Sequence, residues 1–340
     1  MKKKIILITA CFVTLAAITI VALSSLSSQA DIAADREMGK LGEMPISGNP
    51  LYATVAPGLK LKIDTGSDIS AITDKDLRYL DSIGCRIDTT FYPSLGRNGR
   101  GDMVFETVRY RVSLPLYNYT VSKDSLGAIY YRPIAESINM LSNVDFIPSS
   151  SGISVIGIDF LQRFKVEYQY ARGVIALYLD MPEGYEKCCD IQSPLSLIDF
   201  ISLGNRYYMD LEVEHRPYRF FIDTGIQRAH IKLPMSERKI TKHNLLEDTI
   251  VSLRGKFPAL VDERAWLLMG DRERSVKAYY YDNDEEDFAI NPLNVFKQDV
   301  LLDFSNKELL LRPYCAISHY ERPENEASVL AEFDRSQSGL

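Results

Sequence analysis

Two short motifs in this chain could do chemistry together. The triplet Asp-Thr-Gly occurs at residues 64–66 and again at residues 223–225, once in each half of the 340-residue sequence. One copy would be weak evidence, because a three-residue motif often occurs by chance. Two carboxyl groups about 3 Å apart cannot both ionise cheaply, so such a pair shares a proton and can act as general acid and general base. The sequence therefore predicts acid–base chemistry at a pair formed by Asp64 and Asp223.

Each aspartate follows a strand-like stretch and enters a tight turn. Alternating residues 59–63 lead into Asp64, and residues 218–222 lead into Asp223. A glycine after each motif permits a close approach that a Cβ would obstruct, and neighbouring hydroxyls can hydrogen-bond within the turn. The residues that we expect to support the two loops are Thr65, Gly66, Ser67, Thr224 and Gly225.

These motifs and their surroundings resemble the aspartic proteases of the retropepsin and pepsin type, over roughly residues 49–313. That family has an apolar-apolar-Gly element downstream of each motif, where a strand passes beneath the catalytic loop. The first half has Val155-Ile156-Gly157, and the resemblance implies that Gly157 supports the first loop. The second half has Ala289-Ile290-Asn291 and lacks the glycine. The resemblance implies an all-β protein of two related retropepsin-like β-barrel lobes with pseudo-twofold symmetry and few short helices.

The same resemblance implies an aspartic endopeptidase in which Asp64 and Asp223 activate a water molecule. It also implies that Thr65 and Thr224 hydrogen-bond across to the opposing loop, and that an extended peptide or protein is the substrate. Because both lobes lie on one chain, we expect a monomer, with a homodimer as the alternative. We expect no cofactor and no metal.

A mobile hairpin is expected near the first motif. Residues 86–92 and 103–114 alternate like paired strands around a glycine-rich tip at residues 94–102. In the resembled family a flap closes over the substrate from this place, whereas an ordinary exposed hairpin turn is the structural alternative. The flap candidates are Gly96, Asn98, Gly99 and Gly101.

The other local patterns predict a helix, a loop and a cap. A helix over residues 74–82 would begin at the cap Thr73 and end before Gly84. Residues 138–152 are predicted to form a polar loop, and Asp159 is predicted to be the N-cap of a short helix. In the second half, residues 207–222 and 249–268 would form two hairpins like those of the first half.

Two departures from the resembled family lie in the second half. Ile226 follows the second motif where a small residue is usual, and Asn291-Pro292 replaces the apolar-Gly pair. A large side chain at Ile226 could crowd the site or tilt the loop. Two alternatives to the two-aspartate enzyme therefore stay open: a non-catalytic, protease-like peptide-binding protein with a degenerate second lobe, or a homodimeric protease that uses only Asp64 from each chain.

The N-terminal residues suggest export from the cytoplasm. Three lysines precede an apolar run over residues 5–23, which is typical of a cleaved signal peptide or of an uncleaved membrane tether, and both place the body outside the cytoplasm. A polar stretch and a Pro/Gly/Cys-containing linker then divide the chain. The predicted divisions are 1–30 signal or anchor, 31–48 tether, 49–181 first lobe, 182–195 linker, 196–315 second lobe and 316–340 disordered tail.

Composition excludes several other classes. With 46 % hydrophobic residues the chain can fill two cores, and a net charge of −7 argues against a nucleic-acid partner. Its four histidines are scattered without metal-ligand spacing. Cys85, Cys188, Cys189 and Cys315 could pair in three ways, with a bridge from Cys188 or Cys189 to Cys315 as one reasonable choice, or they could be free thiols.

Overall fold

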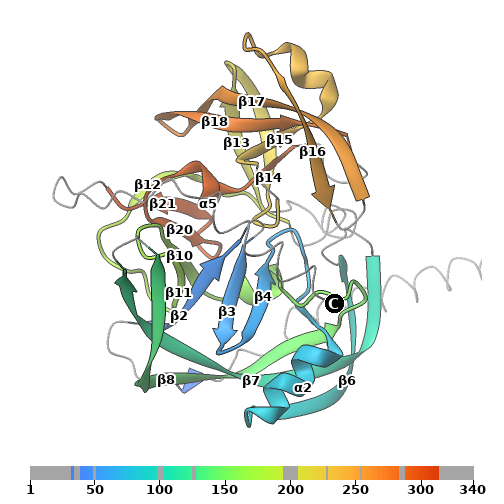
Figure 1. Ribbon diagram of the computed structural model, residues 1–340, viewed down its shortest axis with the longest axis vertical. Coiled ribbons are helices and arrows are strands. Elements are labelled where there is room, and N and C mark those ends of the chain that lie inside the picture. Colours follow the sequence, from blue (N-terminus) through green and yellow to red (C-terminus); the bar gives the residue numbers. More distant parts are fainter. Residues whose placement is uncertain are drawn as a thin grey trace, which may run out of the picture.

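The structure, a computed structural model, shows a mostly β protein in two parts (Figure 1). It describes residues 32–33, 39–48, 51–97, 103–124, 128–193, 206–226, 229–252, 255–282 and 288–313. One sheet has 14 strands and carries most of the first half, and a second has seven strands from the second half. The predicted all-β, two-lobed fold with few short helices is confirmed.

The first half consists of fourteen elements within the described ranges. They are β1 (Ile32–Ala33), β2 (Lys40–Ser47), β3 (Tyr52–Ala56), β4 (Leu59–Ile63), β5 (Ala71–Ile72), α2 (Asp74–Ser82), β6 (Ile87–Arg97), β7 (Met103–Lys123), β8 (Ile129–Pro148), β9 (Val155–Ile156), α3 (Ile158–Leu161), β10 (Lys165–Gln169), β11 (Val174–Tyr178) and β12 (Glu186–Asp190).

The second half repeats this order in a shorter form. Its elements are β13 (Tyr208–Val213), β14 (Arg216–Ile222), β15 (Ile231–Leu233), the 3₁₀ helix η1 (Met235–Lys239), β16 (Leu246–Ser252), β17 (Gly255–Met269), β18 (Arg272–Tyr280), β19 (Ala289–Ile290), α5 (Pro292–Val295), β20 (Val300–Asp303) and β21 (Glu308–Leu311).

Strand pairing shows that the two halves share one plan. The antiparallel hairpin β3–β4 pairs in parallel with β9, and the hairpin β13–β14 pairs in parallel with β19 in the same way. The short strands β5 and β15 each pair in parallel with a long strand, β8 and β18 respectively. The hairpins β6–β7 and β16–β17 also correspond. The internal duplication expected from the two motifs is therefore present in the hydrogen-bonded register.

Alternation of residue type explains how the strands before the aspartates fold. Leu59, Leu61 and Ile63 of β4 are buried in the core of the first lobe, because successive side chains of a strand point to opposite faces. The same period carries Lys62 and Asp64 together onto the other face. The predicted helix over residues 74–82 is also confirmed, and the Thr73 hydroxyl accepts a hydrogen bond from the backbone N–H of Asp76.

The last two described strands join the two halves. Strands β20 and β21 lie in the sheet of the first half, where β20 pairs with β10 over four residue pairs. The buried carboxylate of Asp303 forms an ion pair with Lys165, with 2.8 Å between Oδ1 and Nζ. The buried carboxylate of Glu167 forms one with Arg312, with 3.0 Å between Oε1 and Nη2. Both pairs connect side chains from opposite halves of the sequence.

Two local predictions are wrong. Residues 138–152 are not a loop, because β8 runs to Pro148 and pairs with β7. Bulges at two places in this pair interrupt the alternation that would have revealed the strand. Asp159 is not an N-cap: it lies inside α3, and its Oδ1 accepts hydrogen bonds from the backbone and hydroxyl of Ser70.

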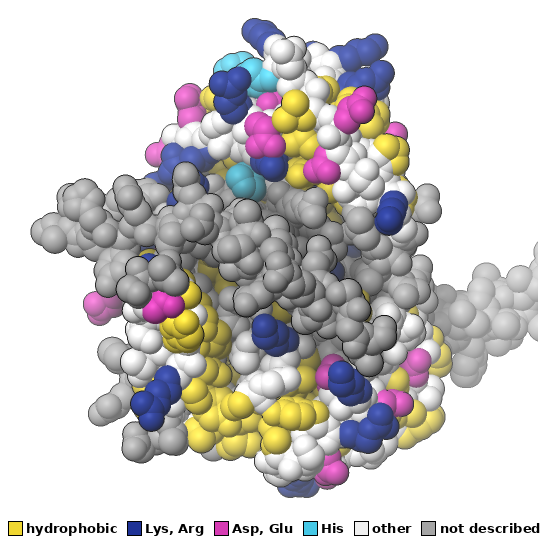
Figure 2. Space-filling model, viewed as in Figure 1, with side chains coloured by type: hydrophobic (Ala, Val, Ile, Leu, Met, Phe, Trp, Pro, Cys, Tyr) yellow, Lys and Arg dark blue, Asp and Glu magenta, His cyan; other side chains and the backbone are white. Residues whose placement is uncertain are grey.

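Several predictions fall outside the described residues. They concern the signal or anchor over residues 1–30, the flap tip at residues 98–102 and the tail over residues 316–340. No helix in the described ranges is long and apolar enough to cross a membrane. On the face shown in Figure 2, hydrophobic side chains gather over the first lobe, and acidic and basic side chains are interspersed around them.

Candidate active site

The two Asp-Thr-Gly loops meet, and their threonines hold them together. The Thr65 hydroxyl donates to the carbonyl of Ile222 at 2.8 Å and accepts from the backbone N–H of Thr224 at 3.0 Å. The Thr224 hydroxyl donates to the carbonyl of Ile63 at 3.2 Å and accepts from the N–H of Thr65 at 3.1 Å. Both hydroxyls are buried, so these reciprocal bonds also satisfy backbone groups that water cannot reach.

The glycines bring the two carboxyl groups against the opposite loops. A Cβ placed on Gly225 would lie 2.6 Å from Oδ1 and 2.8 Å from Oδ2 of Asp64. A Cβ placed on Gly66 would lie 3.1 Å from Cγ and Oδ1 of Asp223. Each carboxylate thus packs on the glycine of the other motif, in space that a side chain would fill. The predicted meeting of Asp64 and Asp223 is found in the structure.

Matching backbone bonds position the two aspartates. The N–H of Asp64 donates to Ile156 of β9 at 3.0 Å, and the N–H of Asp223 donates to Ile290 of β19 at 2.8 Å. The Gly66 N–H then donates to Oδ1 of Asp64 at 3.0 Å, and the Gly225 N–H to Oδ1 of Asp223 at 2.7 Å. The two aspartates differ in solvent exposure, because Asp64 is buried and Asp223 is partly exposed.

A buried lysine breaks the symmetry of the pair. Lys62 is 7 % exposed, and its Nζ lies 2.6 Å from Oδ2 of Asp64. The equivalent position two residues before Asp223 is Phe221, which is buried. We did not predict Lys62 as a site residue. The period-2 alternation of residues 59–64 was the available signal, since residues two apart on a strand share a face.

Both aspartates stabilise the positive charge of Lys62. Burial by itself would lower the pKa of Lys62, but the negative charges of Asp64 and Asp223 and the hydrogen bond to Asp64 outweigh it and raise that pKa above its ordinary value. Lys62 is therefore protonated through the acidic and neutral range, and the site contains one cation and two carboxyl groups.

The other predicted support residues lie around the first loop. The Ser67 hydroxyl donates to the carbonyl of Ile69 at 2.9 Å. A Cβ on Gly157 would lie 2.7 Å from the carbonyl oxygen of Ser67, so glycine is needed where this element passes beneath the loop. Gly157 also donates its N–H to the hydroxyl of Ser70 at 3.0 Å.

The two departures of the second half leave its framework intact. Asn291, in place of the glycine, accepts at its side chain from the N–H of Leu293 and donates from Nδ2 to the carbonyl of Thr224 at 3.2 Å. It caps α5, whose first position is Pro292, where a missing N–H costs nothing. Ile226 is 6 % exposed and packs in a hydrophobic cluster of the second lobe with Phe221.

The flap is described only in part. Strands β6 and β7 pair up to Arg97 and Met103, so the predicted hairpin is present, and the backbone of Gly96 pairs with Val104. The other three candidates, Asn98, Gly99 and Gly101, lie outside the described residues. The proposal that this hairpin covers a substrate stays a prediction.

The three cysteines among the described residues are free thiols. Cys85 and Cys188 are buried, Cys189 is partly buried, and these three form no disulfide with one another. Cys315 lies outside the described residues, so a bridge to it stays a prediction.

Comparisons with known proteins find likeness in structure. No protein-family model matches the chain, and the comparison with curated proteins finds no match. The aspartic proteinase from Irpex lacteus is 10 % identical with a TM-score of 0.42, covering 80 % of this chain and 96 % of that one. Basic 7S globulin from soybean is 10 % identical with a TM-score of 0.40, covering 80 % and 94 %. Conglutin gamma, a basic 7S globulin from lupine seeds, is 9 % identical with a TM-score of 0.41, covering 79 % and 94 %.

The architecture follows from the chain's own geometry. Two halves with the same strand pairing each present an Asp-Thr-Gly loop, the loops are tied by reciprocal threonine bonds, and strands from both halves form a shared sheet. Built in this way, the chain has the pepsin-like bilobal fold.

Proposed function

We propose that this protein is an aspartic-type endopeptidase whose catalytic pair is Asp64 and Asp223. One observation carries the proposal: each carboxylate packs on the glycine of the opposite motif, so the two acids face each other at one place. Both aspartates come from one chain, so a monomer would hold the complete site. The substrate would be an extended peptide segment that pairs its backbone with the neighbouring strands.

The mechanism follows from the surroundings of the two acids. The ammonium of Lys62, 2.6 Å from Asp64, favours negative charge on Asp64, so the shared proton is assigned to Asp223. Asp64 then removes a proton from a bound water, and the oxygen of that water attacks the scissile carbonyl carbon. At the same time Asp223 donates its proton to the carbonyl oxygen. Collapse of the tetrahedral intermediate passes a proton to the leaving amine and returns the pair to its first state.

Substitution of each aspartate tests this proposal. Asp64→Asn and Asp223→Asn should each abolish cleavage of an unfolded protein substrate, because the pair works only with both acids. Asp81→Asn, at an exposed position in α2, is the matched control and should cleave like the parent. Loss of activity in Asp64→Asn alone would favour a homodimer that uses one aspartate from each chain. Equal activity in all three variants would exclude this site as the catalytic one.

A second function is favoured by a specific contact. In the buried ion pair, the positive charge of Lys62 compensates the negative charge of Asp64. With that charge compensated, both aspartates can ionise, and the two acids then have no proton to share. The protein would then bind extended peptides without cleaving them. This alternative keeps the same fold and the same loops, and it differs from the enzyme only in the protonation of the pair.

Removal of the lysine separates the two functions. Lys62→Met keeps much of the apolar stem and removes the charge, while Lys60→Met, at an exposed position of the same strand, is the control. In an active enzyme, Lys62→Met should move the pH–rate profile toward higher pH, because the nearby cation no longer favours loss of the shared proton. In a binding protein, the parent should bind but not cleave a peptide, and Lys62→Met should gain cleavage. Absence of both binding and cleavage in all variants would contradict both proposals.

A further inference from the structure

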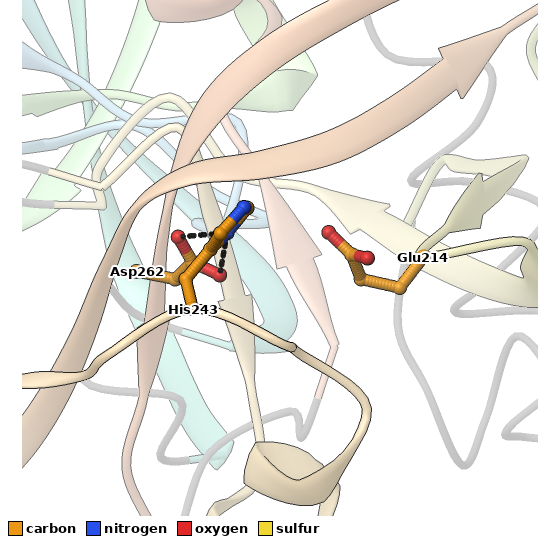
Figure 3. Close-up of side chains that lie close together, drawn as sticks. All are labelled: Glu214, His243 and Asp262. Carbon is orange, nitrogen blue, oxygen red and sulfur yellow. Dashed lines mark hydrogen bonds and ion pairs between the residues drawn. The ribbon is translucent and has the colours of Figure 1, made fainter.

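Three side chains of the second lobe, none of them in an Asp-Thr-Gly motif, converge on one point. They are Glu214, His243 and Asp262, and one possible ligand atom from each lies within 4.8 Å of the others. Figure 3 shows the Glu214 carboxylate pointing toward the bonded pair of His243 and Asp262. They come from the turn between β13 and β14, the loop after η1, and β17.

The cluster has more negative charge than its neighbours balance. Asp262 is 1 % exposed, and its two carboxylate oxygens each lie 3.0 Å from Nδ1 of His243. Among the described residues, neither Asp262 nor Glu214 forms an ion pair with a lysine or arginine side chain. Burying a carboxylate is costly unless it is paired, so two adjacent carboxylates with one imidazole favour an added cation.

Backbone groups already orient both carboxylates as a metal site requires. Asp262 accepts from the N–H of Arg264 at 2.8 Å and from the hydroxyl of Thr241. Glu214 accepts at Oε1 from the N–H of Trp266 at 2.7 Å. Such outer hydrogen bonds hold ligands in place before a metal arrives.

The backbone at this place sets the direction of two of the three side chains. Glu214 and His215, with φ of 49° and 61°, form the two-residue turn of the β13–β14 hairpin, and β17 carries a bulge just after Asp262. Bulges that re-aim side chains are common next to active sites.

A buried hydroxyl gives an independent indication that this place can hold a ligand. Tyr280 of β18 is fully buried, and its Oη has no hydrogen-bond partner among the described residues. Asp262 pairs with Ala278, so Tyr280 lies two residues further along the adjacent strand and on the same face. Burial, and then the charges of Asp262 and Glu214, raise the pKa of Tyr280, which places its hydroxyl in the field of both carboxylates. A water molecule bound to a cation would give this hydroxyl a partner.

We propose that Glu214, His243 and Asp262 bind one divalent transition-metal ion, with Zn²⁺ as the best fit. One imidazole nitrogen and two carboxylate oxygens are ligands that zinc accepts, and three protein ligands leave a fourth position for water. Calcium is excluded as the preferred ion because it takes oxygen ligands rather than imidazole. His243 is exposed, so the ion can enter from solvent. The ion would join three separate segments of the second lobe and so stabilise it.

Metal titration of the full chain tests the site. Protein first treated with a chelator should bind one equivalent of Zn²⁺ by calorimetry, with no comparable binding of Ca²⁺. Because the ion binds only the folded protein, Zn²⁺ at about 100 times its dissociation constant should raise Tm by roughly 5 to 10 °C. Zn²⁺ should also change the fluorescence of Trp266, the single tryptophan, whose backbone N–H donates a hydrogen bond to Glu214.

Three variants locate the binding. Glu214→Gln keeps an acceptor for Trp266 but loses the charge, and His243→Gln removes the imidazole at an exposed position. Each should weaken Zn²⁺ binding more than about tenfold, since even changes to outer partners cost roughly 10–100-fold. His215→Asn is the matched control, because His215 adjoins Glu214 with a φ of 61° that asparagine tolerates, and it should bind Zn²⁺ like the parent.

Two outcomes would overturn the proposal. The first is no Zn²⁺ binding by the parent protein. The second is undiminished binding by His243→Gln, which would place any bound zinc elsewhere, for instance at cysteines. Because His243 is exposed, that variant should fold even if Glu214→Gln does not, and its far-UV circular dichroism checks this. Both outcomes are independent of whether the aspartate pair cleaves peptides.

Discussion

At the scale of single residues, the two threonines carry the junction between the loops. Thr65 and Thr224 are both buried and each makes one donated and one accepted bond to the other half. Reciprocal bonds of this kind fix the separation and tilt of the two aspartates. By contrast, Lys62 and Phe221 stand at equivalent positions and differ completely in charge, so the symmetry of the framework does not extend to the electrostatics of the site.

Removal of one threonine hydroxyl should loosen this junction. Thr224→Val keeps the shape of the side chain but leaves the carbonyl of Ile63 and the N–H of Thr65 without partners. We expect the free energy of unfolding to fall by about 1–3 kcal/mol, as for other buried unsatisfied groups, and any cleavage activity to fall with it. Urea unfolding and a peptide-cleavage assay measure the two effects. Thr224→Ser, which keeps the hydroxyl, should lose much less of both, and equal losses in Ser and Val variants would contradict a role for the hydrogen bonds.

At the scale of elements, each half supports its loop with a short parallel strand and a short helix. In the first half Gly157 leads from β9 into α3, and in the second Asn291 leads from β19 into α5. The glycine allows close packing, whereas the asparagine makes bonds of its own to Leu293 and Thr224. The two halves therefore reach the same geometry by different means, and the second one is a complete framework.

The asparagine should be important for that framework. Asn291→Ala removes the N-cap of α5 and the bond to the carbonyl of Thr224, so we expect a loss of about 1–2 kcal/mol in the free energy of unfolding. Asn291→Ser keeps a capping hydroxyl but not the amide donor, and should lose less. Denaturant unfolding of the three proteins measures the difference. An alanine variant as stable as the parent would show that the packing of β19 alone supports the loop.

The contact between β15 and β18 should make the second lobe sensitive to acid. At the start of β15, His230 accepts at Nδ1 from the N–H of Lys277, and burial with the nearby charge of Lys277 lowers its pKa to about 4. As pH falls from about 6.5 to 4, the unfolded chain gains a proton on this histidine and the folded protein does not, so stability is lost in that interval.

His230→Asn should remove this loss, because the amide oxygen can accept the same bond without titrating. We expect the parent to lose about 1–3 kcal/mol more stability than His230→Asn between pH 6.5 and pH 4. Urea unfolding at the two pH values gives the difference. His215→Asn is the control and should follow the parent, and parallel curves for the parent and His230→Asn would contradict the assignment.

At the scale of the whole molecule, β20 and β21 tie the two halves into one body. These strands end the second half but pair with β10 of the first half. Asp303 sits at this junction with no exposed surface, where it accepts from Lys165 and from the residues of its own turn. Burial alone would raise the pKa of Asp303, but these bonds outweigh it and lower that pKa.

Loss of Asp303 should therefore destabilise both halves together. Asp303→Ala leaves the Lys165 ammonium near the shared sheet without its partner, and we expect a loss of about 3–5 kcal/mol, typical of a broken buried pair. Trp266 fluorescence reports the second lobe, and far-UV circular dichroism reports both, so the two thermal transitions should fall together. Asp210→Ala, which breaks an exposed pair with Arg219, should cost less than about 1 kcal/mol. A shift of one transition without the other would show that the halves unfold independently.

Interactions between residues close in the sequence allowed many strands and the helix over residues 74–82 to be predicted. Alternation before each motif predicted the hairpins, and Thr73 and Gly84 bounded the helix, because strand period, caps and turns depend on neighbours within a few positions. The bulges of the β7–β8 pair interrupt the alternation, so residues 138–152 look like a loop in the sequence although β8 runs to Pro148. The local sequence predicts a cap at Asp159 because its partner, Ser70, lies far away in the chain.

The sequence by itself determined that there are two related halves, that each presents one Asp-Thr-Gly loop, and which face of β4 is apolar. Only the tertiary structure decided that β20 joins the first sheet and that Glu214, His243 and Asp262 converge. The reason is physical. Local patterns reflect the backbone geometry of a few adjacent residues, whereas contacts between distant residues depend on how the halves pack as a whole, and that packing leaves no periodic mark in the sequence.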